Sequence, residues 1–236
     1  MFGHRGAPAT GLPENSYASF ARALADGATA LETDAHRTED GVVVLSHDPV
    51  VRGVEIRAAT LADVRAVDRG GGERVPVLTD FLARFPSVPV NIDIKQIEPA
   101  MEPDVVRAVG DHAPRVLLAS FHVDALRRVR ALGYAGPTGL ARAEIRALLL
   151  FPRALLRLRG IRGARAQVPR GRGRLRFDTP AFVAKCHALG LRVDYWTVND
   201  VDEARALLDL GADGIMSDAP ATVRPAFITR GLRASP

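Results

Sequence analysis

Residues 192–217 read RVDYWTVNDVDEARALLDLGADGIMS and contain one complete strand, helix and strand pattern. The short apolar runs near both ends predict strands, and the longer amphipathic run at 200–210 predicts a helix. Asp200 is a favourable N-cap residue, acids follow it in the first turn, and Gly211 ends the helix. A unit of this kind is typical of proteins with a parallel sheet.

The same pattern recurs along the chain, with a helical segment between consecutive strands. Eight such units are the number in a (β/α)8 TIM barrel, and 236 residues suit one barrel domain. We therefore predict the α/β class and a single TIM-barrel domain over residues 1–236. The expected strands end near His4, Asp34, Lys95, Ser120, Leu140, Val168, Val198 and Ser217.

The connection between the second and third expected strands is too long for one helix. Residues 42–46 predict an extra strand in it, and residues 61–67 and 78–85 predict two short helices. We expect this short insertion to contribute to function, because long loops on a barrel commonly carry it.

Composition favours a soluble globular protein, with 47% hydrophobic and 25% charged residues. No apolar run reaches the roughly 18–20 residues that a membrane-spanning helix needs. Motif residues follow Met1 directly, so we expect a cytoplasmic protein, with a peripheral membrane location as the alternative. Cys186 is the sole cysteine and cannot form an internal disulfide.

Positive charge is concentrated in residues 141–176, which contain eleven arginines and one acid, for a net charge of +10. The rest of the chain carries −5, so we expect a local contact and no nucleic-acid partner. Two hypotheses explain this basic stretch. Residues 145–176 contact an anionic membrane, or they contain an ordinary barrel helix with solvated arginines; Pro152 predicts a break in the helix in either case.

Polar residues that could take part in catalysis or binding cluster where the expected strands end, as in the active sites of barrel enzymes. Glu32 and Asp34 are two residues apart on one strand, so their side chains share a face. Adjacent buried carboxylates favour a hard divalent cation such as Mg²⁺ or Ca²⁺, with Asp93 as a third oxygen donor. Spacing alone equally allows exposed acids at strand ends.

Lys95 shares a face with Asp93 and is one of only two lysines, which indicates a need for a compact ammonium there. A solvated lysine at a strand end is the alternative. His4 and His47 are candidate proton carriers, since imidazole can accept or donate a proton near neutral pH. We interpret the four other histidines as structural or exposed.

Eight short motifs in order resemble those of glycerophosphodiester phosphodiesterases and span most of the chain. They are HRG (4–6), PEN (13–15), ETD (32–34), HD (47–48), IDIK (92–95), SF (120–121), WTVN (196–199) and ADGIMSD (212–218).

This resemblance implies metal-dependent hydrolysis of glycerophosphodiesters to an alcohol and glycerol 3-phosphate. It implies that His4 and His47 are the acid and base, in either order, and that Arg5 and Lys95 bind phosphate. The implied cation ligands are Glu32, Asp34 and Asp93. Family members usually have glutamate at the position of Asp93, which leaves open the identity of the metal and whether this acid binds it directly.

Three further residues are candidates for substrate contact. Asn15 is one, with a helix N-cap as its alternative role. Trp196 and Phe121 are expected to wall the substrate pocket, with ordinary packing as the alternative. The segment after His47 is compact compared with family members that carry an inserted cap, which leaves the leaving-group alcohol open.

The predicted partner is a small-molecule or lipid-derived phosphodiester, and nothing in the sequence predicts an oligomeric state. Two other functions remain alternatives. One is activity of the lysophospholipase D or sphingomyelinase D type on a lipid; the other is a non-catalytic phosphate-ligand binding protein on the same fold. Metal-dependent amidohydrolases are disfavoured, because no His-x-His motif ends the first expected strand.

Overall fold

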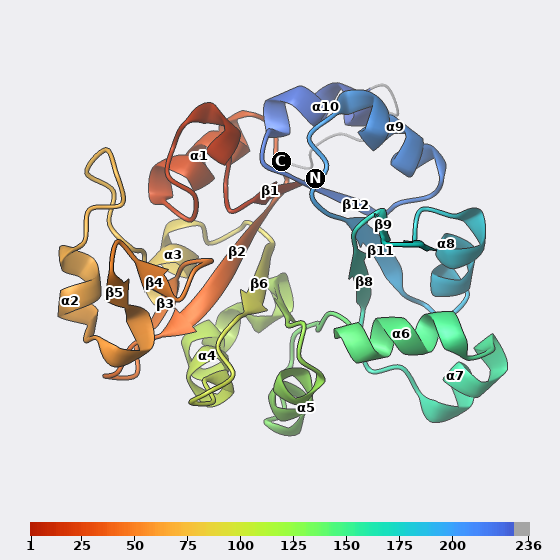
Figure 1. Ribbon diagram of the computed structural model, residues 1–236, viewed down its shortest axis with the longest axis horizontal. Helices are drawn as coiled ribbons and strands as arrows, with labels where there is room; N and C mark the ends of the chain where they lie inside the picture. The colour runs from red at the N-terminus through yellow and green to blue at the C-terminus, as the bar shows by residue number, and fades with distance from the viewer. Residues whose placement is uncertain (229–236) are drawn as a thin grey trace.

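Parallel strands form the centre of the molecule, in the order β7-β6-β2-β1-β12-β11-β8, and helices surround them (Figure 1). The structure, a computed structural model, describes residues 1–228. These strands are β1 (Phe2–His4), β2 (Ala30–Arg37), β6 (Val90–Ile94), β7 (Val116–Ala119), β8 (Arg165–Val168), β11 (Arg192–Tyr195) and β12 (Gly214–Ser217).

A short extended segment links the two ends of this row of strands. Thr138 forms a parallel bridge with Leu118 of β7, and Gly139 forms one with Arg165 of β8. The eighth barrel position is therefore filled by isolated bridges where we expected a strand ending near Leu140. Pro137 offers no N–H for a ladder and Gly139 has no side chain to pack, which explains the short pairing.

The other expected strand ends agree with the structure to within one residue except in two strands: β2 continues beyond Asp34 to Arg37, and β11 ends at Tyr195 and not near Val198. Beyond Tyr195 the backbone bonds to two different strands. The N–H of Trp196 donates to Val168 O (3.2 Å), while that of Val198 donates to Met216 O (2.9 Å). Trp196 thus lies just past the strand end, on the side where the loops follow the strands.

The barrel helices follow their strands as the pattern predicted. They are α1 (Tyr17–Ala25), α3 (Leu78–Arg84), α4 (Glu102–Val109), α5 (Val123–Ala131), α6 (Arg142–Leu150), α7 (Arg153–Arg159), α8 (Pro180–His187), α9 (Val201–Asp209) and α10 (Pro220–Ile228), with 3₁₀ turns η1 (Pro8–Thr10) and η3 (Gly110–Arg115). In α9 the Asp200 side chain accepts hydrogen bonds from the N–H groups of Asp202 and Glu203, as expected for an N-cap. Leu207 and Leu208 are buried on its inner face.

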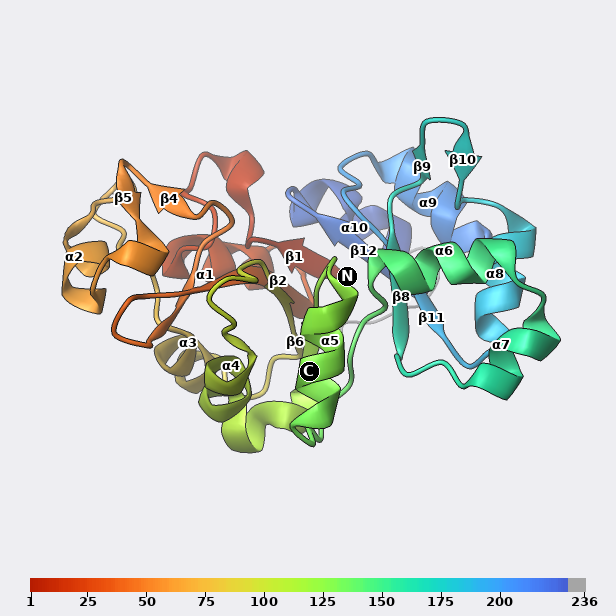
Figure 2. The same cartoon turned by 60° about the horizontal axis from the view of Figure 1, so that its bottom comes forward.

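The connection between β2 and β6 contains the expected extra strand and, besides the barrel helix α3, the other expected short helix. Strand β3 (Val43–Leu45) pairs antiparallel with the end of β2. The other elements are a small hairpin of β4 (Val50–Val51) and β5 (Val54–Glu55), the turn η2 (Ile56–Ala58) and α2 (Leu61–Ala66). They lie at one side of the barrel, in orange in Figures 1 and 2.

The basic stretch forms two helices and a hairpin. Pro152 separates α6 from α7, which confirms the predicted break. The loop at 170–176 forms a hairpin of β9 (Gly171–Arg172) and β10 (Leu175–Arg176), which the sequence did not predict. Figure 2 shows this hairpin above α6, with α7 below it. Within residues 1–228, no helix has the length and apolar character to cross a membrane.

Candidate functional site

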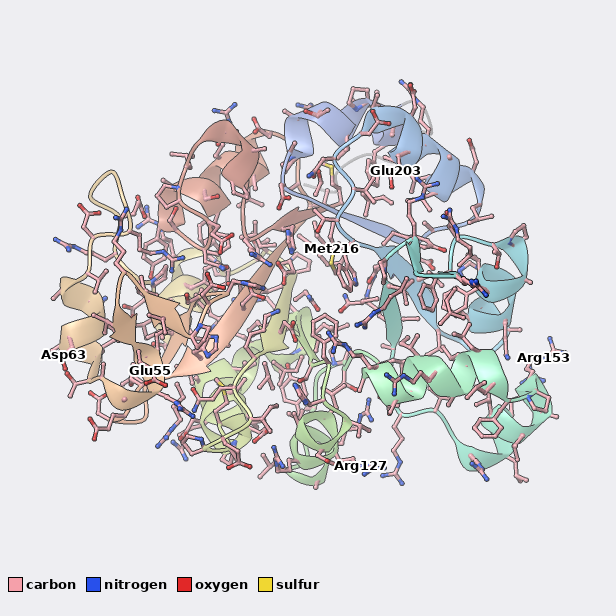
Figure 3. The ribbon with its side chains drawn as sticks, in the orientation of Figure 1. Glu55, Asp63, Arg127, Arg153, Glu203 and Met216 are labelled. Carbon is pink, nitrogen blue, oxygen red and sulfur yellow. The ribbon has the colours of Figure 1, made fainter. Side chains whose placement is uncertain are left out.

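A cavity of about 310 Å³ opens at the ends of the parallel strands. Met216, which lines it, lies near the middle of the molecule in Figure 3. Nine of the ten predicted site residues line this cavity: His4, Arg5, Glu32, Asp34, His47, Asp93, Lys95, Phe121 and Trp196. They come together because β1, β2 and β6 are neighbours in register, with His4 beside Glu32 and Asp34 beside Asp93.

The HRG motif turns the chain sharply at the end of β1. Arg5 has φ of 55° and Gly6 has φ of 93°, a backbone region that favours glycine. A Cβ at Gly6 would also lie 2.3 Å from Ser19 Oγ on α1, so no larger residue fits. The turn directs the backbone N–H of Arg5 toward Glu32, where it donates to Oε2 at 3.1 Å.

His4 is held by a carboxylate on one ring nitrogen. Its Nδ1 lies 2.7 Å from Asp218 Oδ1, and its Nε2 lies 3.8 Å from Glu32 Oε2. Burial opposes protonation of this ring, but the charge of Glu32 and the hydrogen bond with Asp218 outweigh it and raise the pKa of His4. Asp218 thus fixes the ring so that Nε2 is the nitrogen nearest Glu32.

His47, which lies just after β3 in the insertion, also has a carboxylate on one ring nitrogen. Its Nδ1 lies 2.8 Å from Asp48 Oδ1, which leaves Nε2 without this partner. About a third of the His47 side chain is exposed, against 15% for His4. Each histidine therefore has a carboxylate on Nδ1, an arrangement that selects the tautomer and orients the ring.

Lys95 occupies the centre of the acidic group. Its Nζ lies 2.9 Å from Asp34 Oδ1 and 2.7 Å from Asp93 Oδ2. Arg5 Nε lies 3.3 Å from the other oxygen of Asp34. Burial would raise the pKa of Asp34, but these two cations outweigh it and lower that pKa, while the two carboxylates raise the pKa of Lys95 despite its burial. Lys95 is therefore a charged ammonium.

The negative charges of Glu32 and Asp93 are less fully balanced by nearby cations than that of Asp34. Burial, together with the charge of Asp34, raises the pKa of Glu32 well above its usual range. Burial also raises the pKa of Asp93, whose Oδ1 atom is buried without a hydrogen-bond partner. These oxygens suit a hard cation such as Mg²⁺ or Ca²⁺, which would stabilise their ionised forms. Within residues 1–228, no three His, Cys, Asp or Glu side chains are grouped as a ready metal site, so the cation remains a prediction.

Asn15 does not line the cavity but lies fully buried behind it. Its Nδ2 donates to Asp34 Oδ2 at 3.1 Å, and its Oδ1 accepts from Thr33 Oγ1 at 2.6 Å. The N-cap of α1 is the next residue, Ser16. The contacts of Asn15 therefore position the Asp34 carboxylate.

Sequence reasoning assigned no role to several residues that the structure brings to the site. Asp218 and Asp48, which orient the two histidines, both lie inside the quoted motifs. Asp218 directly follows the last expected strand and Asp48 directly follows His47, and these positions could have indicated their contacts with the histidines. Asn199 donates from Nδ2 to Asp218 Oδ2 at 3.2 Å. Arg142, whose guanidinium lies 4.2 Å from the Phe121 ring centre, gave no local signal within its arginine-rich stretch.

The chain is similar to known proteins of one family. The model of the glycerophosphoryl diester phosphodiesterase family matches residues 4–222. The chain is 37% identical to a "Probable glycerophosphodiester phosphodiesterase 2" of Mycobacterium tuberculosis, over 97% of this chain and 90% of the relative. It is 27% identical to "Lysophospholipase D GDPD1" of Rattus norvegicus, over 94% of this chain and 83% of the relative.

Solved structures share the fold. A putative glycerophosphoryl diester phosphodiesterase of Silicibacter pomeroyi superposes with a TM-score of 0.79 at 27% identity, covering 98% of this chain and 94% of that one. An Oleispira antarctica phosphodiesterase, solved in complex with the product sn-glycerol-3-phosphate, has a TM-score of 0.75 at 23% identity and covers 96% of both chains.

Proposed function

Because the chain belongs to the glycerophosphoryl diester phosphodiesterase family, we propose that it hydrolyses glycerophosphodiesters to an alcohol and glycerol 3-phosphate. The observation that carries this proposal is the pair of histidines on one cavity, each with a carboxylate on Nδ1. A protein that only binds phosphate has no need of two oriented proton carriers, so this pair favours catalysis over mere binding.

In the proposed reaction the two imidazoles move protons in opposite directions. One Nε2 accepts the proton of the attacking hydroxyl, which belongs to water or to a neighbouring hydroxyl of the substrate. The new bond to phosphorus forms as the bond to the leaving alcohol breaks, and the other imidazolium gives its proton to the leaving oxygen. Attack by a substrate hydroxyl gives a cyclic phosphate, which water then opens with the two histidines in exchanged roles: the imidazole that gave up its proton accepts one from water, and the other imidazolium returns its proton to the ring oxygen that leaves.

Charge compensation is the second contribution of the site. Lys95 and Arg5 present an ammonium and a guanidinium at the cavity and are suited to stabilise the negative phosphoryl oxygens. Glu32, Asp34 and Asp93 would hold the divalent cation. When bound, the cation would supply Lewis-acid stabilisation of charge on the phosphoryl oxygens.

Product analysis tests the proposal directly. The protein is incubated with glycerophosphocholine or glycerophosphoethanolamine and Mg²⁺ or Ca²⁺, and we expect glycerol 3-phosphate and the free alcohol. Chelation should abolish turnover, and metal addition should restore it. Absence of product from both substrates contradicts the proposed function, whereas full activity in a sample shown to be metal-free by elemental analysis contradicts the cation alone.

A further inference from the structure

Gln167 lines the cavity from the side opposite its acidic residues. It belongs to β8, whereas Asp34, which contacts both Lys95 and Arg5, belongs to β2. In the closed ring, β8 is the fourth position from β2 in both directions, through β1, β12 and β11 or through β6, β7 and the bridged segment at 138–139. A phosphate bound by Lys95 and Arg5 therefore has a substituent that can reach across the cavity to Gln167.

A buried carboxylate fixes the orientation of the Gln167 amide. Gln167 Nε2 donates to Asp194 Oδ2 at 3.2 Å, and Asp194 is fully buried at the paired position of β11. The other oxygen of Asp194 accepts from Arg165 Nη1 at 2.5 Å. This ion pair favours the ionised carboxylate, which accepts hydrogen bonds and donates none, so the NH₂ group of Gln167 must face it. Within residues 1–228 nothing donates to Gln167 Oε1, which is left as an acceptor for a ligand.

The charges around Gln167 favour a neutral hydroxyl as its partner. Phe121 and Arg142 share one part of the wall with Gln167, since all three also line a second cavity on that side. The Arg142 guanidinium lies 4.2 Å from the centre of the Phe121 ring, and Lys95 Nζ lies 5.4 Å from it. Arg142 forms no ion pair within residues 1–228, so a cationic alcohol such as choline would be repelled here, whereas a glycerol hydroxyl would not.

We propose that Gln167 Oε1 accepts a hydrogen bond from the C1 hydroxyl of the substrate's glycerol group, with Asp194 as the positioning residue for its amide. The inference rests on the proposed function, because the glycerol group reaches Gln167 only while the phosphate is bound. The C1 hydroxyl is the one farther from phosphorus and can reach the opposite wall, whereas the C2 hydroxyl stays close to the phosphate. A diester without the C1 hydroxyl leaves Oε1 unpaired and is selected against.

Two substrates that share one leaving alcohol measure this contact in the wild type. Choline release is followed from glycerophosphocholine and from its 1-deoxy analogue, in which C1 is a methyl group. The esterified choline has no hydrogen-bond donor, so only the glycerol group can donate to Gln167, and both substrates keep the C2 hydroxyl. We expect kcat/KM to be about tenfold higher for glycerophosphocholine than for the analogue.

Substitutions assign this ratio to Gln167. Gln167→Met keeps the length of the side chain without its amide and should bring the ratio to within about twofold of one, because neither substrate then has the acceptor. Gln167→Asn, which withdraws the oxygen but keeps an amide beside Asp194, should lower the ratio even if Gln167→Met does not fold. The matched control is Gln96→Met, at a buried glutamine that does not line the cavity, which should keep the wild-type ratio.

Asp194→Asn tests the positioning role separately. The new amide can donate to Gln167, which allows the Gln167 amide to turn over, so the ratio should fall although Gln167 is still present. An unchanged ratio in this variant overturns the role of Asp194.

The other outcomes separate the contact from the reaction itself. No choline release from either substrate contradicts the proposed function as a whole. Equal kcat/KM for the two substrates in the wild type, an unchanged ratio in Gln167→Met, or an equal loss of the ratio in Gln96→Met overturns the contact of Gln167 with glycerol and leaves the proposed reaction standing.

Discussion

At the scale of single residues, the two lysines of an arginine-rich chain have a common feature. Lys95 Nζ is held by Asp34 and Asp93, and Lys185 Nζ donates to the carbonyl oxygens of Leu148 and Phe151 at the end of α6. In both places one small ammonium contacts two oxygens at once. A planar guanidinium has a different shape, which gives a physical reason for lysine at both positions.

Replacing Lys95 by arginine should therefore impair the enzyme although the charge is kept. The guanidinium of Lys95→Arg is too bulky to lie between Asp34 and Asp93 and leaves the phosphate without a correctly placed cation. We expect kcat/KM for glycerophosphocholine to fall by roughly tenfold or more. Steady-state kinetics of the purified variant measure the effect.

Lys185→Arg is the matched control, since Lys185 lies away from the cavity. It should retain wild-type kcat/KM even if its melting temperature changes. Equal kcat/KM in Lys95→Arg and the wild type would show that Lys95 is an ordinary strand-end lysine.

Most residues of the site could be predicted from the sequence, but the hydrogen-bond and ion-pair partners of these residues could not. The spacing of Glu32 and Asp34 predicted a shared face, and β2 provides it. The interposition of Lys95 between two carboxylates depends on the register of β2 with β6, which no local pattern encodes. The role of Asp218 likewise depends on β12 lying beside β1, at opposite ends of the chain.

At the scale of elements, periodicity predicted the strands and helices that bury a regular apolar face. Periodicity was less successful in predicting short strand pairings that lack a regular apolar face. The segment at 137–140 pairs through isolated bridges only, and the arginine-rich loop forms the β9–β10 hairpin. Neither has the alternating apolar pattern by which strands are recognised.

The helices α6 and α7 bear on the hypothesis of membrane contact. Ile145, Leu148 and Leu156 are buried, as an ordinary barrel helix requires, but Leu150 and Leu158 are 77% and 85% exposed. Arg157 and Arg159 flank Leu158 in the sequence, and Arg153, which Figure 3 labels at the outer edge of the molecule, follows Leu150 by three residues. Exposed leucines among arginines are suited to an anionic lipid surface.

We therefore propose that the exposed leucines and arginines of α6 and α7 bind anionic vesicles at low salt, and that this binding weakens as the salt concentration is raised. The variant with Arg153, Arg157, Arg159 and Arg162 changed to glutamine should lose this binding in co-sedimentation. A matched control removes the same charge elsewhere, by changing Arg107, Arg127, Arg192 and Arg205 to glutamine. No binding by the wild type at low salt, or equal loss in both variants, would contradict a membrane role for α6 and α7.

At the scale of the whole molecule, the barrel explains why residues from both ends of the chain form one site. Strands β1 and β12 are neighbours, so the HRG turn meets the aspartate that follows β12, while the insertion brings His47 to the same cavity. Closure of the barrel also places a second cavity next to the one that contains the histidines. It is lined by α6, which follows the bridged segment at 137–140, and by the β9–β10 hairpin, which follows β8. The cavity of the proposed reaction and the second cavity thus lie side by side.

The central claim is that His4 and His47 carry protons for cleavage of a phosphodiester, and kcat of their alanine variants on glycerophosphocholine tests it most directly. His4→Ala and His47→Ala should each lower kcat by about 10²-fold or more, the usual scale for loss of a general acid or base. His122→Ala, at an exposed histidine outside the cavity, should retain wild-type kcat. A kcat near the wild-type value in either His4→Ala or His47→Ala, with thermal unfolding unchanged, would contradict the account.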